Sequence, residues 1–160
     1  STDEKAAAGL VEVTPETPPD SCLYTWGYEA DGVTISSTAK SMTDINVVDD
    51  NGDPVLDHNG DQMVQLGVRS ELKAAVKQQQ GSLLSQTDWA VTRKAEKTTA
   101  IPANIVTWRD AIRTKATAME DAIDGAADTA AVAALFLSYT LEDDGSMTKS
   151  GILYDWPEIG

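Results

Sequence analysis

The sequence predicts an α+β protein: a small antiparallel β-unit, then three or four helices, then an extended C-terminal tail. Two observations predict this class. Asp-Gly and Asn-Gly pairs separate short apolar runs up to about residue 66, which is typical of antiparallel hairpins. After residue 67 the apolar residues recur every three or four positions, which is the period of an amphipathic helix. A chain of 160 residues is also long enough to bury a core of its own.

Charge is distributed unevenly along the chain. Residues 1–66 carry 13 acidic and two basic side chains, whereas residues 67–141 carry eight acidic and nine basic ones. Such a shift favours a boundary between structural units, which either have separate solubilising surfaces or place an acidic unit against a basic partner. We therefore predict four segments: a docking arm at 1–21, a β-unit at 22–66, a helical unit at 67–141 and an extended tail at 142–160.

Composition excludes several function classes. A net charge of −14 argues against nucleic acid as a partner and against charge-driven binding to an anionic membrane. One cysteine (Cys22) and one histidine (His58) exclude a disulfide framework and a Cys/His zinc cluster. The first ten residues lack the pattern of a signal peptide, and the longest apolar run, 130–137, is too short to insert into a membrane. We expect a soluble, non-secreted protein without a cofactor.

The β-unit is justified by its turn residues. Three prolines in residues 1–21 favour an extended arm over a helix. Residues 22–36 have aromatic and β-branched residues on both sides of Asp31-Gly32, which predicts a hairpin. Residues 45–66 predict a three-stranded meander with type I′ turns at Asn51-Gly52 and Asn59-Gly60.

The helical unit is justified by its apolar spacing and its capping residues. A first stripe begins at Val68, and Gly81 weakens or ends that helix. Thr87 and Asp88 provide a cap for a second helix, which begins at Trp89.

Two more helices follow. Pro102 fits the first position of a long helix that ends near Gly125. Its apolar face serves an internal core and a trimeric bundle equally well, and consists of Ile105, Trp108, Ile112, Ala116, Met119 and Ile123. Asp128 fits the cap of a last, Ala-rich helix, which carries Val132, Leu135, Phe136 and Tyr139.

The residue pattern does not indicate catalytic chemistry. His58 lies between two turn signals, and Cys22 starts a strand and is expected to be a small buried side chain. The Asp and Asn residues between Asp49 and Asp61 are ordinary turn residues or, alternatively, a weak cation site. Phosphate-binding glycine motifs and a paired carboxylate cleft are not apparent. We predict that the protein is not an enzyme.

The tryptophans and the basic helix residues are the candidates for protein contact. Trp108 lies on the apolar stripe and is expected in the core, whereas Trp156 packs back onto the body or inserts into a partner. Arg109 and Arg113 are one helical turn apart and could grip a carboxylate of a partner or of this chain. The full set of candidates is Trp89, Arg93, Trp108, Arg109, Arg113, Trp156 and Pro157.

The stretch SLLSQTDWAVTRKAEKTTAIPANIVTWRDAIR and the later DWPE resemble the C-terminal region of bacteriophage tail-fibre assembly proteins, also called tail assembly chaperones. That family shows a leucine pair, T-D-W, a Pro-led helix with a W/Y-R-x-A-[IL]-R motif, and a closing W-P. The matching residues are Leu83, Leu84, Thr87, Asp88, Trp89, Pro102, Trp108, Arg109, Ala111, Ile112, Arg113, Trp156 and Pro157. The resemblance covers about half of the chain.

The chain departs from the family by the segment AVTRKAEKTTAIP and by an extra Ala-rich helix. The resemblance implies a non-enzymatic phage tail protein of the fibre or baseplate region, located in the virion tail and, during assembly, in the host cytoplasm. Its expected partners are other tail proteins, with self-association as a trimer in addition. The alternatives are a tail-fibre assembly chaperone absent from the virion and a glycan-acting tail hydrolase.

Overall fold

The computed structural model describes Thr14 and residues 16–160 and confirms the α+β class. The rest of the predicted arm, residues 1–13 and 15, lies outside the described residues. The chain divides into two units, of which the first ends at Lys40 and the second comprises Ser41–Gly160.

This boundary lies inside the predicted β-unit 22–66, because residues 41–44 bind the first turn of the following helix. The N–H of Val68 donates to the carbonyl of Ser41 at 2.9 Å. The N–H of Gly67 donates to the Asp44 carboxylate at 2.8 Å, and this bond, the largest cause, lowers the pKa of Asp44.

The first unit contains the predicted hairpin. Strand β1 (Tyr24–Tyr28) pairs antiparallel with β2 (Ile35–Ala39). In the connecting loop Gly32 has a φ of 70°, and the Asp31 carboxylate accepts bonds from the Thr34 hydroxyl and from two backbone N–H groups. The aspartate therefore closes the turn through its side chain while the glycine supplies the left-handed conformation.

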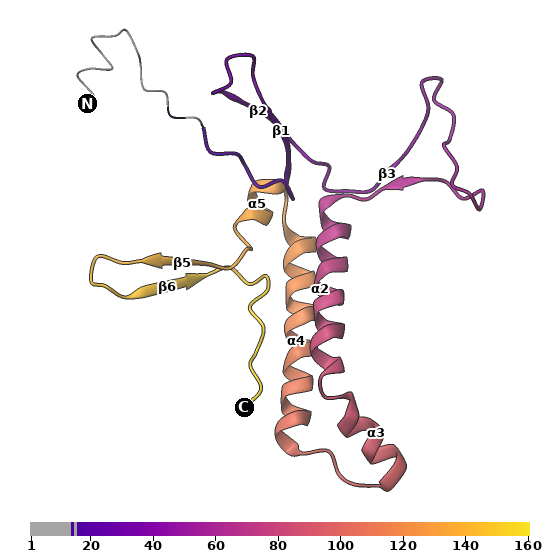
Figure 1. Cartoon of the computed structure of the whole chain (residues 1–160), viewed down its shortest axis with the longest axis vertical. Helices are drawn as coiled ribbons and strands as arrows, with labels where there is room; N and C mark the ends of the chain where they lie inside the picture. The colour runs from indigo at the N-terminus through magenta and orange to yellow at the C-terminus, as the bar shows by residue number, and fades with distance from the viewer. Residues whose placement is uncertain (1–13, 15) are drawn as a thin grey trace. The chain divides into compact units, whose positions relative to one another are not determined.

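The second unit opens with a small β-arrangement at residues 45–66, which begins with the strand labelled β3 in Figure 1. Its named strands are β3 (Ile45–Asn46) and β4 (Val64–Gln65), which are antiparallel. Three backbone bonds form a ring: Val47 donates to Met63, Met63 to Val55, and Val55 to Val47, at 2.8–3.0 Å. The side-chain amide of Gln62 donates to all three carbonyls at 2.7–3.2 Å. The three runs of the predicted meander thus meet around one amide.

The two tight turns of this β-arrangement differ from the predicted type I′. Only the glycines, Gly52 and Gly60, have positive φ values (87° and 88°), whereas type I′ needs positive φ at both central residues. The N–H of each glycine donates to the carbonyl of Asp49 or Asp57, three residues earlier. The prediction of type I′ was wrong. Each turn instead runs from the aspartate to the glycine three residues later, and the carboxylate of that aspartate, Asp49 or Asp57, stabilises it by accepting bonds from the backbone N–H groups that follow.

The core of the second unit lies between two long helices, α2 (Val68–Ser85) and α4 (Ala103–Gly125), which run side by side (Figure 1). The predicted stripe on α4 is confirmed, since all six of its residues are buried. Helix α2 buries Val68, Leu72 and Val76 and continues through Gly81, which therefore does not end it. Each fully buried apolar side chain contributes about 1.5–3 kcal/mol.

Helix α3 (Asp88–Lys97) follows α2 after a short turn. Of the predicted Thr87-Asp88 cap, Thr87 holds the N-cap position, without a side-chain capping bond, and Asp88 is already the first helical residue, so the helix begins one residue before the predicted Trp89. Pro102 likewise holds the N-cap position of α4, with φ −53° and ψ 137°, and not the first helical position. The side chains of Thr87 and Asp88 bind α4, as described below.

The last predicted helix is much shorter than expected. Asp128 caps α5 (Thr129–Ala133) as predicted, accepting a bond from the N–H of Ala131 at 2.8 Å. Phe136 and Tyr139 lie beyond the helix, and residues expected in the helix and the tail instead form an antiparallel hairpin. Its strands are β5 (Ser138–Leu141) and β6 (Met147–Ser150).

Gly151 fixes the base of this hairpin. It has a φ of 83°, and a Cβ on it would lie 2.1 Å from the carbonyl oxygen of Phe136. The next two N–H groups, of Ile152 and Leu153, both donate to the carbonyl of Leu135 at 2.8 Å, and Leu153 is fully buried. A side chain at position 151 would separate the hairpin from this support.

Candidate protein-contact site

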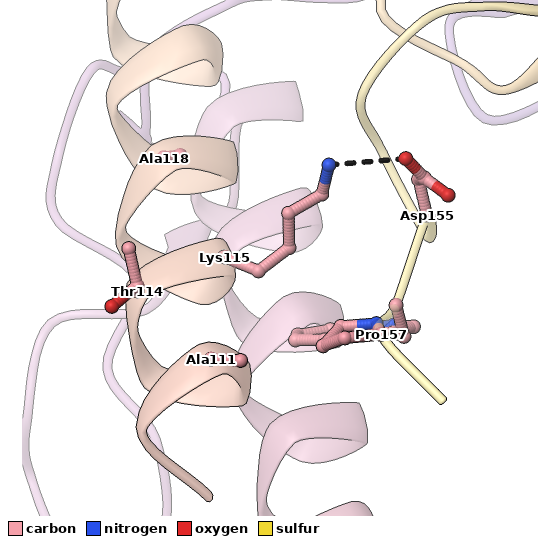
Figure 2. A pocket seen from close by; sticks show the side chains of 7 residues that line it. Ala111, Thr114, Lys115, Ala118, Asp155 and Pro157 are labelled. Atoms are coloured by element: carbon pink, nitrogen blue, oxygen red, sulfur yellow. Dashed lines mark hydrogen bonds and ion pairs between the residues drawn. The ribbon is translucent and has the colours of Figure 1, made fainter. Parts of the chain in front are cut away.

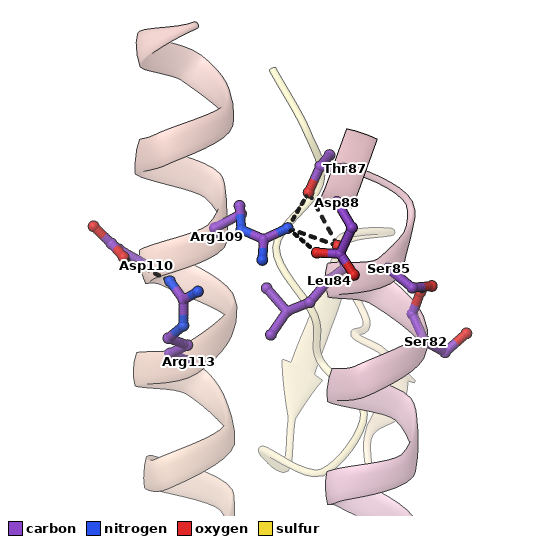
Figure 3. A network of polar contacts seen from close by, with 8 residues as sticks. All are labelled: Ser82, Leu84, Ser85, Thr87, Asp88, Arg109, Asp110 and Arg113. Carbon is purple, nitrogen blue, oxygen red and sulfur yellow. Dashed lines mark hydrogen bonds and ion pairs between the residues drawn. The ribbon is translucent and has the colours of Figure 1, made fainter. Parts of the chain in front are cut away.

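Arg109 connects α4 to the α2–α3 turn (Figure 3). Its Nη1 donates to the carbonyl of Leu84 and to the Thr87 hydroxyl, each at 2.7 Å, and to the Asp88 carboxylate at 2.9 Å. Only 12% of the Arg109 side chain is exposed, and Thr87 is buried. Four residues of the family-like motif therefore form one polar cluster.

Arg113 takes no part in this cluster (Figure 3). Its Nη1 lies 2.9 Å from the Asp110 carboxylate, one turn earlier on the same helix, and half of its side chain is exposed. The two arginines therefore do not form a common clamp for one carboxylate. Arg109 binds an acidic residue of its own chain, Asp88, which was one of the two predicted alternatives.

Trp108 binds the C-terminal segment, residues 151–160. The indole is 6% exposed, and its Nε1 donates to the carbonyl of Pro157 at 2.8 Å. The Trp156 indole in turn donates to Oε1 of Gln79 on α2 at 2.7 Å. Of the two predicted alternatives for Trp156, the structure has the one in which it packs back onto the body.

Asp155 holds the same segment by charge. Its carboxylate pairs with Lys115 of α4 at 3.1 Å and also with Lys149 of β6. The hydrogen bond from Lys149 is the largest cause that lowers the pKa of Asp155, and the bond from Lys115 is the next. The same contact raises the pKa of Lys149. One carboxylate thus joins the long helix, the hairpin and the C-terminal segment.

A groove of about 430 Å³ lies between α4 and the C-terminal segment (Figure 2). A second hollow of about 270 Å³ adjoins it and shares Ala111 and Pro157. The polar groups at the first groove, Lys115 and Asp155, already pair with each other. The rest of the lining is mostly apolar and consists of Ala111, Thr114, Ala118, Trp156 and Pro157.

Two of the candidate contact residues stay exposed on α3. Trp89 is 53% exposed, and Arg93 lies one turn further along. Within the part of the chain that the structure describes, Arg93 forms no ion pair. Of the seven candidates, Trp108, Arg109, Trp156 and Pro157 make internal contacts, and Trp89, Arg93 and Arg113 remain accessible.

Sequence reasoning missed the β5–β6 hairpin and its exposed apolar side chains. All eight residues of β5 and β6 are exposed, including Tyr139 (58%), Leu141 (69%) and Met147 (60%). The alternation of apolar and hydroxyl residues around Asp144-Gly145 is the signal that could have revealed it.

The small β-arrangement also exposes apolar side chains. Six of them are 44–55% exposed: Ile45, Val48, Leu56, Met63, Val64 and Leu66. The same segment, 41–66, contains six aspartates and no lysine or arginine. This surface is therefore both apolar and acidic, which suits contact with a basic protein surface.

The Asp/Asn-rich turns use their carboxylates locally. Asp49 accepts bonds from the N–H groups of Asn51 and Asp53 at 2.8 and 2.9 Å, and these bonds, led by that from Asp53, lower its pKa. Asp57 does the same in the second turn. Across the described residues, no group of three or more His, Cys, Asp or Glu side chains could hold a metal ion. Cys22 is exposed, so the prediction that it is buried was wrong.

A comparison of the chain with protein-family models, with curated protein sequences and with solved structures gives no match. Among the described residues, no helix has both the length and the apolar character that crossing a bilayer requires.

Proposed function

We propose that this chain is a non-enzymatic bacteriophage tail protein, a subunit of the fibre or baseplate region that works through protein–protein contacts. The phage assignment rests on the resemblance of the T-D-W, W-R-x-A-I-R and W-P residues to tail-fibre assembly proteins. In this proposal the chain is made in the host cytoplasm and resides in the virion tail, with other tail proteins as partners.

The observation that carries the proposal is that the family-like residues contact one another. Thr87 and Asp88 bind Arg109, which is more than 20 residues away, and Trp108 binds Pro157, which is 49 residues away. Short matches that arise by chance would have no reason to meet in space. Through these contacts the motif residues together hold α2, α3, α4 and the C-terminal segment in place.

The exposed apolar surfaces support a role in protein contact. Isolated apolar side chains are common on protein surfaces, but a hairpin that is exposed on both faces and a small β-arrangement with six half-exposed apolar residues are not. These surfaces are acidic at their edges, so the partners we propose present apolar surfaces with basic residues.

The second candidate function is a tail-fibre assembly chaperone that is absent from the finished particle. The resemblance itself favours it, because the family that the motif residues resemble consists of such assembly proteins. Both functions use the same contact surfaces, and they differ in whether the chain leaves after assembly.

The test is mass spectrometry of purified particles of the phage that encodes the chain, with the infected-cell lysate beside it. A fixed ratio to known tail proteins in the particle is the result expected for a structural subunit. Presence in the lysate alone would identify the chaperone. A gene that lies outside any phage or prophage genome would contradict both functions.

A further inference from the structure

The β5–β6 hairpin has two different faces. In the antiparallel register, Leu141 pairs with Met147 and Tyr139 with Lys149, and cross-strand partners share a face. The other face carries only hydroxyl side chains, two of which, Ser138 and Ser150, bond to each other at 2.7 Å. The first face therefore carries three apolar side chains that are 58–69% exposed, beside Lys149, whose charge is paired with Asp155 of the same chain.

The tip of this hairpin is acidic. Glu142, Asp143 and Asp144 follow one another there, and Asp144 accepts a bond from the N–H of Ser146 that stabilises the turn. We call Tyr139, Leu141, Met147, Glu142 and Asp143 the hairpin surface. A two-stranded hairpin with both faces in water is only marginally stable, so a partner on its apolar face would stabilise it.

Helix α3 carries the complementary surface. Trp89, Arg93 and Lys97 are spaced four residues apart, so they lie along one side of the helix. All three are exposed, and Ala90 is the only residue that α3 buries. We call these three the helix surface. It combines a large exposed aromatic ring with two positive charges.

We propose that the hairpin surface of one copy of this chain docks onto the helix surface of a second copy. The charges are complementary, since the tip of the hairpin, with Glu142 and Asp143, would lie against Arg93 and Lys97, while Trp89 would cover the three apolar side chains. Both surfaces are exposed within a single chain, so they do not cover each other there. The contact is heterologous, and repeating it produces a closed ring or an open chain of subunits.

The first measurement is the mass of the full chain by light scattering at concentrations up to about 100 µM, a range in which weak interfaces associate. We expect a mass that is a multiple of the 17.0 kDa monomer. A monomer throughout this range would overturn the proposal. The measurement does not depend on the phage assignment, so either proposal can fail alone.

Charge reversal tests which surfaces meet. Glu142→Lys with Asp143→Lys reverses the hairpin surface, and Arg93→Glu with Lys97→Glu reverses the helix surface. Each pair should weaken association about tenfold, because attraction across the interface becomes repulsion. A chain with all four substitutions should associate again. An equimolar mixture of the two reversed chains should also associate, in alternation, because each hairpin surface then meets a helix surface of opposite charge on the other chain.

The matched control is Glu29→Lys with Asp121→Lys, which changes the net charge as much as the hairpin reversal does but at exposed sites outside the contact surfaces described above. It should leave the association constant within twofold of wild type. Far-UV circular dichroism checks that every variant is folded. Equal weakening by the control, or a folded four-substitution chain and a mixture that both stay monomeric, would refute the proposed contact.

Discussion

Arg109→Met is the substitution that tests the polar cluster between α4 and the α2–α3 turn most directly. Methionine keeps the unbranched stem and the helix propensity of arginine, while the guanidinium that binds Leu84, Thr87 and Asp88 is lost. The variant therefore changes the cluster with little effect on the helix that carries it.

The expected loss of stability follows from the geometry. Nη1 carries two hydrogens, so its three acceptors share two full bonds, each worth about 1.5–3 kcal/mol for a charged donor. Since Asp88 is 57% exposed, its share is reduced to less than about 1 kcal/mol. We expect Arg109→Met to lower the free energy of unfolding by about 3 kcal/mol.

Urea unfolding followed by far-UV circular dichroism measures this loss by linear extrapolation. The matched control is Arg113→Met on the same helix, whose single ion pair with Asp110 is half-exposed and is expected to cost about 0.5 kcal/mol or less. The reasoning is refuted if Arg109→Met costs under about 1 kcal/mol, or if the two variants cost the same.

Three more outcomes are expected. In thermal unfolding, Gly151→Ala should lower the melting temperature more than Gly145→Ala. Both glycines have a φ of 83°, but only at position 151 would the new Cβ clash with backbone atoms. Equal losses of melting temperature would contradict the role of Gly151 at the base of the hairpin. Met119→Ala should cost about 2–5 kcal/mol in urea unfolding, because the residue is fully buried, and a smaller loss would place it outside the core. The lowered pKa of Asp155 stabilises the folded chain above the unfolded pKa of about 3.9, and this stabilisation is lost as the pH falls through the lower pKa of the folded state. The melting temperature of wild type should therefore fall more steeply below about pH 4 than that of Asp155→Asn. Parallel plots of melting temperature against pH for the two proteins would argue against this.

The sequence predicted the core of the second unit because helical spacing leaves a direct trace in the order of residues. Ile112, Met119 and Ile123 recur with that period and are all buried. The hairpin could not be predicted by the same rule, since Val132, Phe136 and Tyr139 have helical spacing as well. Local pattern is overridden there by contacts with residues far away, which begin at Gly151.

The candidate contact residues could be recognised in the sequence, but for most of them it could not be predicted whether the side chain contacts this chain or the solvent. Trp108 is the exception, since it lies on the apolar stripe of α4, was expected in the core and is buried. For Trp156 both a partner and this chain's own body were possible, because its bond to Gln79 on α2, 77 residues away, leaves no local pattern. Likewise Arg109 and Arg113 differ only in which of them faces the α2–α3 turn.

The attachment of the C-terminal segment to α4 has a consequence for folding during synthesis. A ribosome makes α2, α3 and α4 before it adds residues 155–157, so Trp108 and Lys115 have no partner from that segment while the helices emerge. The helix pair can form before that segment is made, because α2 and α4 contact each other directly. Until translation has passed Pro157, the nascent chain exposes the side of α4 that the C-terminal segment later covers. During that time the exposed side of α4 can pair wrongly with a second nascent chain.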